Sequence, residues 1–424
     1  MNATTIPRPV LAAAEEFPIA FHDDVAYQGP LGAAWAPGRV NVIGEHTDYN
    51  AGFVLPIAVE RVAAFAGHKR NDEIVRLWSL HFEQYAEFSL LGLPQTFEQQ
   101  CQNLPLWARY ILGVITELAR LGTPLSGFDA VVGGDVPLGG GMSSSASLEV
   151  ATAQICDLFS GGRLTIGEYG ALITPMQLAA LCQRAEHLAS GLCSGVLDQA
   201  ASCLGQPGKA VFIDCRSYEY RYVPFEAPSV ALVVIDSSVR RELASSAYNE
   251  RRSQCEEAVN VLRAVMVQHE PGNGQAEEIT ALREISQEQF ERYKYYLPQI
   301  LRRRVAYVIA ENARVLRVVK LLERGNMPAV GSILWQSHAG LKNEYEVSCM
   351  ELDALVEIAR CVPGVLGARM MGGGFGGCTV NLVQNDAIAL LCRVVERKYM
   401  QRTGRQAGID ICRAVGGPGK QVIR

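Results

Sequence analysis

The sequence has no long hydrophobic run and no excess of positive charge. No apolar stretch approaches the ~18 residues of a membrane-spanning helix, so we expect no membrane partner. Lys and Arg together number 39 and Asp and Glu number 44, which gives a formal charge of −5. A chain of this charge lacks the general field that attracts nucleic acid or anionic lipid. We therefore expect no nucleic-acid partner, and any bound phosphate needs a local site.

Cysteine and histidine also lack the spacing of a disulfide framework or a zinc site. Twelve cysteines are scattered from Cys101 to Cys412 without a C-x-x-C pair, and the seven histidines form no H-x-x-x-H cluster. The first sixteen residues resemble neither a secretory signal nor an arginine-rich transit peptide. A chain of 424 residues can bury a core without disulfides. We therefore expect reduced thiols and a cytoplasmic location.

The length predicts two domains or more, because a domain usually has ~100–200 residues. The stretch from Pro224 to Pro228 is a candidate boundary, which gives domains at 20–225 and 226–424. A return of the C-terminal strand to the first domain stays open. Short apolar runs predict β-structure over 31–70, with a break at Pro37-Gly38. Similar patterns predict helices near 107–121, 143–159, 176–189 and 196–204, a mostly helical 248–340, and strands near 128–132, 210–214, 230–235, 365–371 and 378–383.

A loop rich in glycine and serine, Pro137–Glu149, joins a predicted strand to a predicted helix. Backbone N–H groups at a helix start can hold phosphate oxygens, and glycines let the phosphate approach closely. The hydroxyls of Ser143, Ser144, Ser145 and Ser147 can cap the helix, contact phosphate or ligate Mg²⁺. No G-K-[ST] follows, so this is not a Walker A loop. A simple capped helix after a flexible turn is the alternative.

Two more clusters combine unusual composition with predicted strands. Gly372–Gly377 fits G-x-G-x-x-G, but it lies between strands without a dinucleotide-binding βαβ unit, so it indicates either a loop close to a ligand or backbone, or a plain hairpin turn. Gly38–Asn50 is dense in carboxylates and imidazole, which suit the recognition of a polyol. A solvated hairpin with an ion pair from Arg39 to Glu45 or Asp48 is the alternative for this segment.

Together the three clusters resemble the three motifs of the GHMP small-molecule kinases, and the first is similar to the signature of the galactokinase family. The resembling stretches are 38–56, 137–150 and 367–379, with further matches at Glu186, 195–199, 248–252 and 337–348. Almost the whole chain takes part. The resemblance implies an α+β fold of two domains, with the active site in the cleft between them.

The resemblance also implies a reaction, in which ATP, with Mg²⁺, phosphorylates the C1 hydroxyl of α-D-galactose as the first step of galactose catabolism. Asp198 matches the family's proton acceptor, and Arg39 matches the residue that steadies it. The positions that match sugar-binding residues are Glu45, His46, Asp48, Gly195 and Tyr248. The positions that match nucleotide-binding residues are Trp107, Gly139, Gly140, Gly141, Met142, Ser143, Ser144 and Ser145. Ser145 and Glu186 match the magnesium ligands.

Three alternatives to a galactose kinase remain. N-acetylgalactosamine kinases have a similar first motif but read Ile where Thr47 stands and lack the Asn50-x-Gly-Phe pattern. Other sugar 1-kinases are more distant. The yeast-type galactose sensor of this family lacks a Ser-Ala pair in the second motif, whereas Ser145-Ala146 is present here. We therefore expect an enzyme whose partners are a sugar and ATP. The composition does not fix the oligomeric state, and a monomer is compatible with it.

Overall fold

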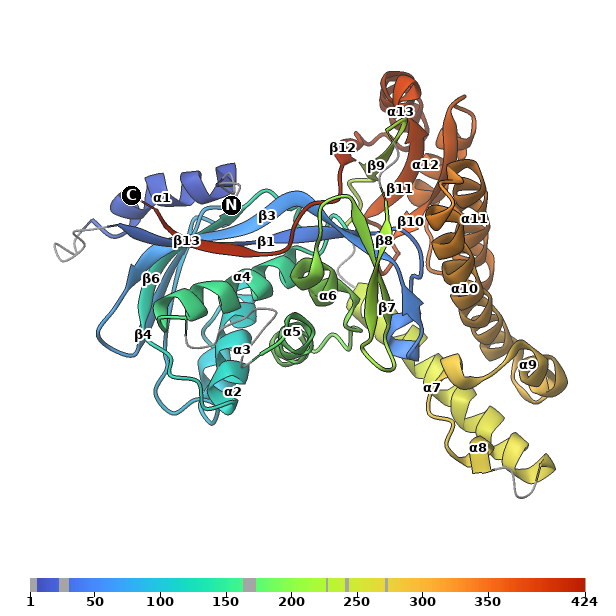
Figure 1. Cartoon of the computed structure of the whole chain (residues 1–424), viewed down its shortest axis with the longest axis horizontal. Helices are drawn as coiled ribbons and strands as arrows, with labels where there is room; N and C mark the ends of the chain where they lie inside the picture. The colour runs from blue at the N-terminus through green and yellow to red at the C-terminus, as the bar shows by residue number, and fades with distance from the viewer. Residues whose placement is uncertain are drawn as a thin grey trace.

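The strands form three sheets, and helices pack against the faces of these sheets (Figure 1). The structure is a computed structural model that describes residues 6–22, 30–162, 173–225, 228–240, 244–270 and 274–423. The strands are β1 (Leu31–Asn41), β2 (Phe53–Val54), β3 (Pro56–Lys69), β4 (Ile74–Ser79), β5 (Gln84–Ser89), β6 (Phe128–Gly134), β7 (Lys209–Asp214), β8 (Tyr220–Pro224), β9 (Val230–Asp236), β10 (Val365–Met371), β11 (Cys378–Gln384), β12 (Gly408–Cys412) and β13 (Gly419–Ile423). The α-helices are α1 (Arg8–Ala20), α2 (Phe97–Cys101), α3 (Leu106–Arg120), α4 (Ser144–Phe159), α5 (Pro175–Ser190), α6 (Leu197–Leu204), α7 (Ala244–His269), α8 (Gly274–Glu277), α9 (Gln287–Tyr293), α10 (Gln299–Glu323), α11 (Met327–Gly340), α12 (Met350–Arg360) and α13 (Ile388–Thr403).

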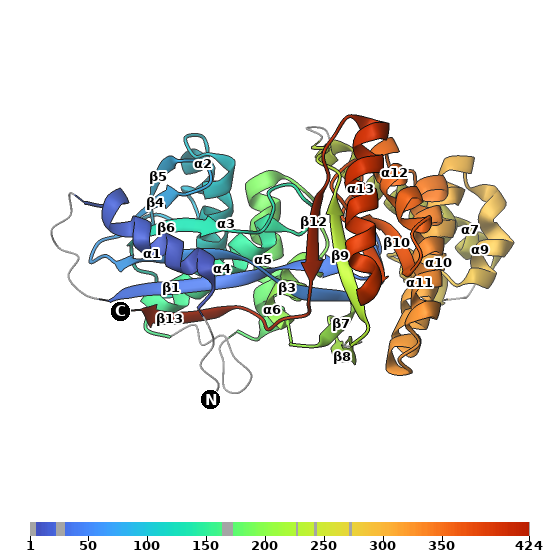
Figure 2. The same cartoon turned by 90° about the horizontal axis from the view of Figure 1, so that it is seen from above.

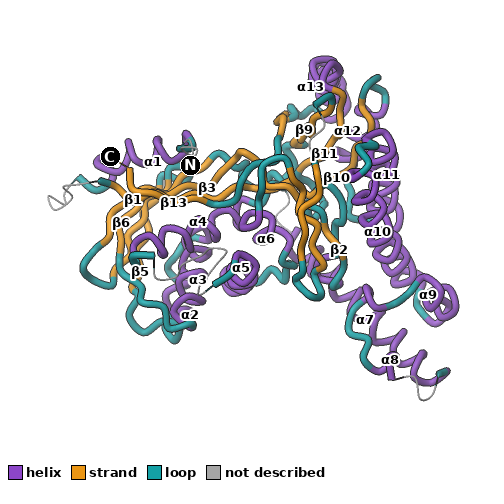
Figure 3. The backbone as a smooth tube through the Cα atoms, viewed as in Figure 1, coloured by secondary structure: helices purple, strands orange, loops and turns teal. Residues whose placement is uncertain are grey.

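The first half of the chain is built on a six-stranded sheet in the order β13-β1-β3-β6-β4-β5. Its pairs are antiparallel except for β4 and β6, which run parallel. Figure 3 shows α1 on one face of this sheet and α3 to α6 on the other. The predicted strands and helices of this half are present, and the structure adds α1, α2, β4, β5 and β8.

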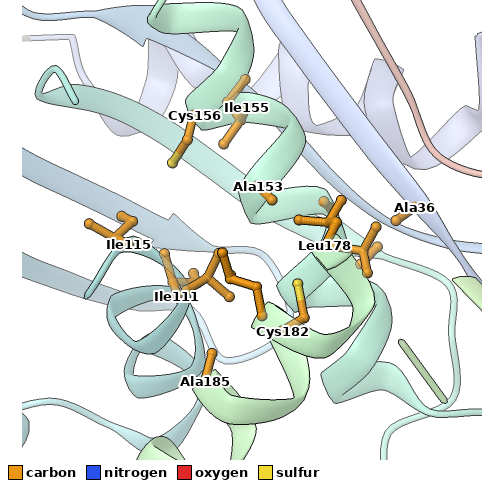
Figure 4. Packing of buried hydrophobic residues seen from close by; sticks show 14 of the residues in the cluster. Ala36, Ile111, Ile115, Ala153, Ile155, Cys156, Leu178, Cys182 and Ala185 are labelled. Carbon is orange, nitrogen blue, oxygen red and sulfur yellow. The ribbon is translucent and has the colours of Figure 1, made fainter. Parts of the chain in front are cut away.

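The main core of this half lies between the sheet and the helices α3, α4 and α5. Figure 4 shows Ile111 and Ile115 of α3 facing Ala153 of α4 and Leu178 and Cys182 of α5. The apolar positions of α3 recur every three or four residues, so they form one stripe that faces this core. This packing fixes the starts of α4 and α6, and the site described below is built on both.

A four-stranded antiparallel sheet in the order β10-β11-β9-β12 anchors the second half. Both of its faces are covered, which is why β9 is a continuous apolar run. Val233 and Ile235 pack against α12 and α13, whereas Leu232 and Val234 face a core that includes α10, α11 and residues of β1 and β3. The second sheet therefore packs directly against the first half of the chain.

Two features differ from the sequence predictions or add to them. The predicted break at Pro37-Gly38 is wrong, because β1 continues through it with a register shift between Pro37 and Arg39. There the Arg39 N–H bonds to the Met142 carbonyl oxygen at 3.1 Å. The C-terminal strand β13 returns to pair with β1 (Figure 2). Among the described residues, no helix has the length and apolar character to cross a bilayer.

Candidate functional site

A cavity of about 420 Å³ lies between the two halves of the chain. From the first half it is lined by Arg39, Glu45, His46, Asp48, Gly139, Gly141, Ser145, Glu186, Leu192, Ser194, Gly195, Leu197 and Asp198. From the second half it is lined by Val239, Arg240, Tyr248 and the segment from Met371 to Gly377. The three glycine-rich or polar clusters of the sequence thus meet in one cleft.

A bidentate ion pair between Arg39 of β1 and Asp198 of α6 lies at the centre of the cleft. Arg39 Nε is 2.7 Å from Asp198 Oδ1 and Nη2 is 2.8 Å from Oδ2. Arg39 Nη1 also donates to the Gly141 carbonyl, and the Ser143 hydroxyl donates to Asp198 Oδ2. Arg39 is only 5% exposed, so the geometry of this pair is tightly constrained. It joins the acidic group directly to the glycine-serine loop.

Glu45 is held by Arg369 of β10, a partner that lies 324 positions away. Arg369 Nη1 and the Gly372 backbone N–H each donate to Glu45 Oε1 at 3.0 Å. Arg369 is completely buried and donates its other protons to backbone carbonyls, including Val42 O at 3.0 Å. Removing one partner of such a buried pair costs far more than the pair contributes. Glu45 is therefore fixed in position rather than free to swing into solvent.

Two side chains of α10 hold the turn that carries His46 and Asp48 by accepting hydrogen bonds from its backbone. Glu311 Oε1 accepts the Gly44 N–H at 3.1 Å, and Asn312 Oδ1 accepts the Phe53 N–H at 2.9 Å. Burial lowers the pKa of His46 to about 3, and the charge of Arg251 adds to this effect. The imidazole is therefore neutral at physiological pH.

Asp48 lies against Gly195 at the start of α6. A Cβ on Gly195 would be 2.2 Å from Asp48 Oδ2, so only glycine fits at this position. Burial raises the pKa of Asp48 to about 7, and the negative charge of Asp198 contributes to the rise. The raised pKa shows that Asp48 has lost hydrogen bonds from water to its charged form. Hydroxyl groups of a ligand can replace those hydrogen bonds.

The glycine-serine loop leads into α4 without a simple serine cap. Ser143 has a positive φ of 58°, and within the described residues its side chain caps no N–H of α4 but donates to Asp198. Ser143 is therefore not a side-chain cap of α4, and phosphate binding by this loop stays a prediction. From the second half, Arg240 Nε donates to the Leu138 carbonyl at 3.0 Å, and the Cys378 thiol donates to the Gly140 carbonyl. The loop is thus fixed at the cleft by contacts from both halves of the chain.

Carboxylates concentrate beneath this loop. Ser145 Oγ donates to Glu186 Oε1 at 2.9 Å, and Ser194 donates to the other oxygen. Gln199 Nε2 bridges Glu186 and Glu149 at 3.1 and 2.9 Å. Burial raises the pKa of both carboxyl groups, and the charge of Glu186 raises that of Glu149 further.

These oxygen donors fit a magnesium ion. Hydroxyl and carboxylate oxygens are the ligands that Mg²⁺ prefers, and a cation would offset the concentrated negative charge. Ser145 and Glu186 both face the cleft. Among the described residues, no group of three or more His, Cys, Asp or Glu side chains forms a site that could hold a metal ion. Mg²⁺ commonly takes one or two protein ligands together with substrate phosphates, so two ligands are compatible with it.

A second cavity of about 610 Å³ continues from the other side of the loop. It shares Gly139 and Ser145 with the cleft, and Ser144 also lines it. Trp107 forms one wall, with Phe82 stacked on it at 6.4 Å between ring centroids and 10° between planes. Two rings at a cavity mouth that ends on a phosphate-type loop suit a nucleotide base.

The structure brings nearly all of the predicted site residues to these two cavities. Gly140, Met142 and Ser143 line neither cavity. Met142 is buried in the core, the Gly140 carbonyl accepts a hydrogen bond from Cys378, and the Ser143 hydroxyl donates one to Asp198. The alternative ion pair from Arg39 to Glu45 or Asp48 is not formed, because the Arg39 guanidinium pairs with both carboxylate oxygens of Asp198 instead. The sequence analysis assigned no role to five residues that have clear contacts here: Phe82, Glu149, Gln199, Arg240 and Arg369.

Comparison with known families defines the class of protein first. The family model for the GHMP kinases N terminal domain matches residues 109–206, and the model for the GHMP kinases C terminal domain matches residues 318–400. The galactokinase galactose-binding signature matches residues 20–69. The fold agrees, since a mevalonate kinase from Methanococcus jannaschii covers 92% of this chain with a TM-score of 0.60 at 16% identity. Both halves therefore have the architecture of a GHMP kinase.

Full-length relatives narrow this class. A galactokinase of Roseiflexus sp. (strain RS-1) is 41% identical over 91% of this chain and 92% of its own. The galactokinase of Homo sapiens is 42% identical over 90% of each chain. The crystal structure of Lactococcus lactis galactokinase complexed with galactose has a TM-score of 0.84 and 31% identity, covering 96% of this chain and 98% of that one. The chain belongs to the galactokinase family.

Proposed function

We propose that this protein transfers the γ-phosphoryl group of ATP to the C1 hydroxyl of α-D-galactose, giving galactose 1-phosphate and ADP. The observation that carries the proposal is the position of the Arg39–Asp198 pair. The pair lies in the cleft with Glu45, His46 and Asp48, and it also contacts the glycine-serine loop through Ser143 and Gly141. A sugar hydroxyl held by the first group would therefore meet a phosphate held by the second.

The proposed sugar site consists of Glu45, His46, Asp48, Gly195 and Tyr248. Carboxylates accept hydrogen bonds from hydroxyls, and the neutral His46 ring offers the one nitrogen that is not bonded to Tyr49. The cavity of about 420 Å³ suits a small polar ligand. Membership of the galactokinase family favours galactose over N-acetylgalactosamine, other sugars or a sensor without turnover.

In the proposed reaction the C1 oxygen forms a bond to the γ-phosphorus while the bond from that phosphorus to the β–γ bridging oxygen breaks. Asp198 accepts the hydroxyl proton or stabilises its departure through its charge, and Arg39 orients Asp198 through two hydrogen bonds. The N–H groups at the start of α4, which follows the loop, would donate to the transferring oxygens. Phosphoryl transfer depends mainly on such positioning and charge stabilisation.

ATP and Mg²⁺ have separate proposed places. We assign the base of ATP to the cavity at Trp107 and its phosphates to Gly139–Ser145, which adjoins both cavities. Ser145 and Glu186 would hold Mg²⁺, which neutralises charge on the phosphate oxygens when bound. The cytoplasm is the proposed compartment: all twelve cysteines lie in the described ranges and are unpaired. Domains at 20–225 and 226–424 remain our proposal, with β13 returning to the first.

The test is ADP release by the Asp198→Ala protein beside the unchanged protein. We expect Asp198→Ala to bind galactose and ATP with little loss of affinity and to release ADP at ~10²-fold or more below the unchanged rate, since general-base catalysis supplies ~10²–10⁴-fold. Undiminished turnover by this variant would contradict the assigned role. Binding of galactose without turnover by the unchanged protein would indicate a sensor instead.

A further inference from the structure

A chain of buried hydroxyl groups extends from His46 away from the cleft. His46 Nδ1 is 2.8 Å from the Tyr49 hydroxyl, which is 2.8 Å from the Tyr345 hydroxyl, and this in turn is 3.1 Å from Cys255 Sγ. Tyr345 is fully buried and Cys255 is 1% exposed. The chain therefore runs through the interior, and only its His46 end reaches the cleft.

The other ring nitrogen of His46 has a different environment. His46 lines the cleft and is 4% exposed, and its Nε2 makes no hydrogen bond of normal geometry among the described residues, although the nearby Gly373 backbone partly opposes the lowering of the pKa of the ring. A buried polar nitrogen without a partner is costly, so it is normally satisfied by water or a ligand. The ring thus has one nitrogen bonded to Tyr49 in the interior and one beside Gly373 at the cleft, within the proposed sugar site.

The backbone on both sides of the chain adopts unusual conformations. His46 has a positive φ of 60°, and its carbonyl is fixed by Asn50 Nδ2 at 2.8 Å. Tyr345 ends a π-helical turn, η4 (Leu341–Tyr345), and Glu346 after it has a φ of 56°. Strained positions and π-turns of this kind cluster at functional sites. The ring of Tyr345 lies 4.9 Å from the His46 ring, measured between centroids.

Every member of the chain is neutral and carries one proton to donate. Burial raises the pKa of Tyr49 and of Tyr345 well above 10 and raises that of Cys255 to about 11, while the His46 ring is neutral because its pKa is about 3. Two directions of donation are then available along the chain. Donation toward His46 places the phenol of Tyr49, a good donor, against the imidazole nitrogen, a good acceptor, whereas the reverse direction ends on sulfur, a weak acceptor.

We propose that Tyr49 and Tyr345, with Cys255 at the far end, form a relay that donates to His46 Nδ1 and so fixes the proton on Nε2, which donates to a hydroxyl of the bound sugar. The inference rests on the proposed function for the identity of the ligand. Tyr49 and Tyr345 are positioning residues, because they act on the sugar only through His46. The sugar oxygen at this place is therefore read as a hydrogen-bond acceptor.

The direct test reads the His46 ring in the sugar-free protein by long-range ¹H–¹⁵N spectra of the histidine-labelled chain, assigned with His46→Gln. We expect the unchanged protein to be protonated on Nε2, with Nδ1 accepting a hydrogen bond. Tyr49→Phe should move the Nδ1 signal to that of a free acceptor nitrogen, and Tyr345→Phe should move it the same way by less. Protonation on Nδ1 in the unchanged protein, or an Nδ1 signal unmoved by Tyr49→Phe, would overturn the relay.

Galactose affinity without nucleotide, measured by calorimetry, gives the second readout. Tyr49→Phe should weaken binding ~10-fold, as loss of orientation of one hydrogen bond predicts, and Tyr345→Phe by a smaller factor. If Tyr345→Phe changes neither the galactose affinity nor the Nδ1 signal, then Tyr345 does not act on His46 through Tyr49, and the proposal is contradicted. Should Tyr345→Phe fail to fold, Cys255→Ala removes the far end instead and should shift Nδ1 slightly in the same direction.

The matched control is Tyr399→Phe, which also removes a buried hydroxyl, one that donates to the Ser237 carbonyl at 2.8 Å on the far side of the second sheet. It should leave the ring signals and galactose affinity unchanged. The two proposals fail separately: a protein that binds no galactose contradicts the proposed function, whereas the tautomer of the sugar-free ring still tests the relay.

Discussion

Arg39 and Asp198 lie 159 positions apart in the chain and meet through two hydrogen bonds of 2.7 and 2.8 Å. Arg39 comes from β1 and Asp198 from the first turn of α6, so the contact depends on how α6 packs beneath the first sheet. The same arginine also contacts the glycine-serine loop. One pair of side chains therefore links the proposed sugar site to the proposed phosphate site.

Arg39→Lys should lower kcat ~10²–10³-fold with a small change in the KM for galactose. Lysine keeps the charge but has one nitrogen, so it cannot hold both oxygens of Asp198 and the Gly141 carbonyl together. Steady-state kinetics check this. Arg61→Lys is the control, because Arg61 pairs with Asp135 and Asp410 outside both cavities and should leave kcat unchanged. Equal kcat values in the two variants would contradict the role of Arg39.

Gly195→Ala should raise the KM for galactose ~10- to 100-fold, because displacement of a binding group by about 1 Å costs this much. The added Cβ would lie 2.2 Å from Asp48 Oδ2 and must push that carboxylate aside. The KM for ATP should stay the same. Gly274→Ala places a methyl group in open space and serves as the control for the glycine change itself. A normal galactose KM in Gly195→Ala would remove Asp48 from the sugar site.

Asp48→Asn should stabilise the protein at high pH and weaken galactose binding. The pKa of Asp48 is raised from 3.8 to about 7 in the folded state, so the folded protein holds this proton more tightly than the unfolded one. Stability therefore falls as the pH rises from about 4 to about 7, and above that range the full cost remains. We expect Asn to recover about 1–3 kcal/mol at pH 8 and almost nothing at pH 4, less than the whole shift implies because Asp48 is only half-buried.

The measurement is the unfolding midpoint of Asp48→Asn and the unchanged protein across this pH range. A stabilisation that is independent of pH would show that Asp48 ionises normally. Galactose affinity of the unchanged protein should also decline below pH 7, because a protonated Asp48 has lost acceptor capacity.

Phe82→Ala should raise the KM for ATP ~10-fold without affecting the KM for galactose, as expected for loss of one stacking ring. Phe82 is half exposed and stacks on Trp107, so its removal leaves the core intact. Tyr295→Ala provides a control at an exposed ring remote from both cavities. A change in galactose KM alone would place the nucleotide elsewhere.

The sequence was sufficient to predict which groups meet in the cleft, and their chemical roles stay a prediction. Arg39 and the glycine-serine loop lie in dense motifs, whereas Asp198 alone looks like a first-turn helix acid and was found through the family resemblance; the structure places all three together. The partners of these groups were not predictable in the same way. Arg369 resembles any strand residue until β10 is placed beside Glu45, and only the tertiary fold decides that Arg39 pairs with Asp198 rather than Glu45.

The fold shows the same division. The strand β9 was predicted from its continuous apolar run, and the helix α3 from apolar residues at helical spacing, because both patterns follow from burial. The β4–β5 hairpin was missed, although buried residues such as Val75 and Leu77 alternate with less buried ones along it. Arg76 within it is paired with the buried Asp129 of β6. The strand through Pro37-Gly38 continues because the Met142 carbonyl accepts the Arg39 N–H where the sheet register shifts.

The most direct test of the central claim is ³¹P NMR of a reaction containing the purified protein, Mg·ATP and galactose, with N-acetylgalactosamine and arabinose in parallel. We predict that galactose gives equal amounts of ADP and a single sugar phosphate, whose phosphorus couples to the anomeric proton of the α form. Asp198→Ala should form neither product at a comparable rate. A phosphate on another hydroxyl, a preference for another sugar, or the absence of any sugar phosphate would contradict the account.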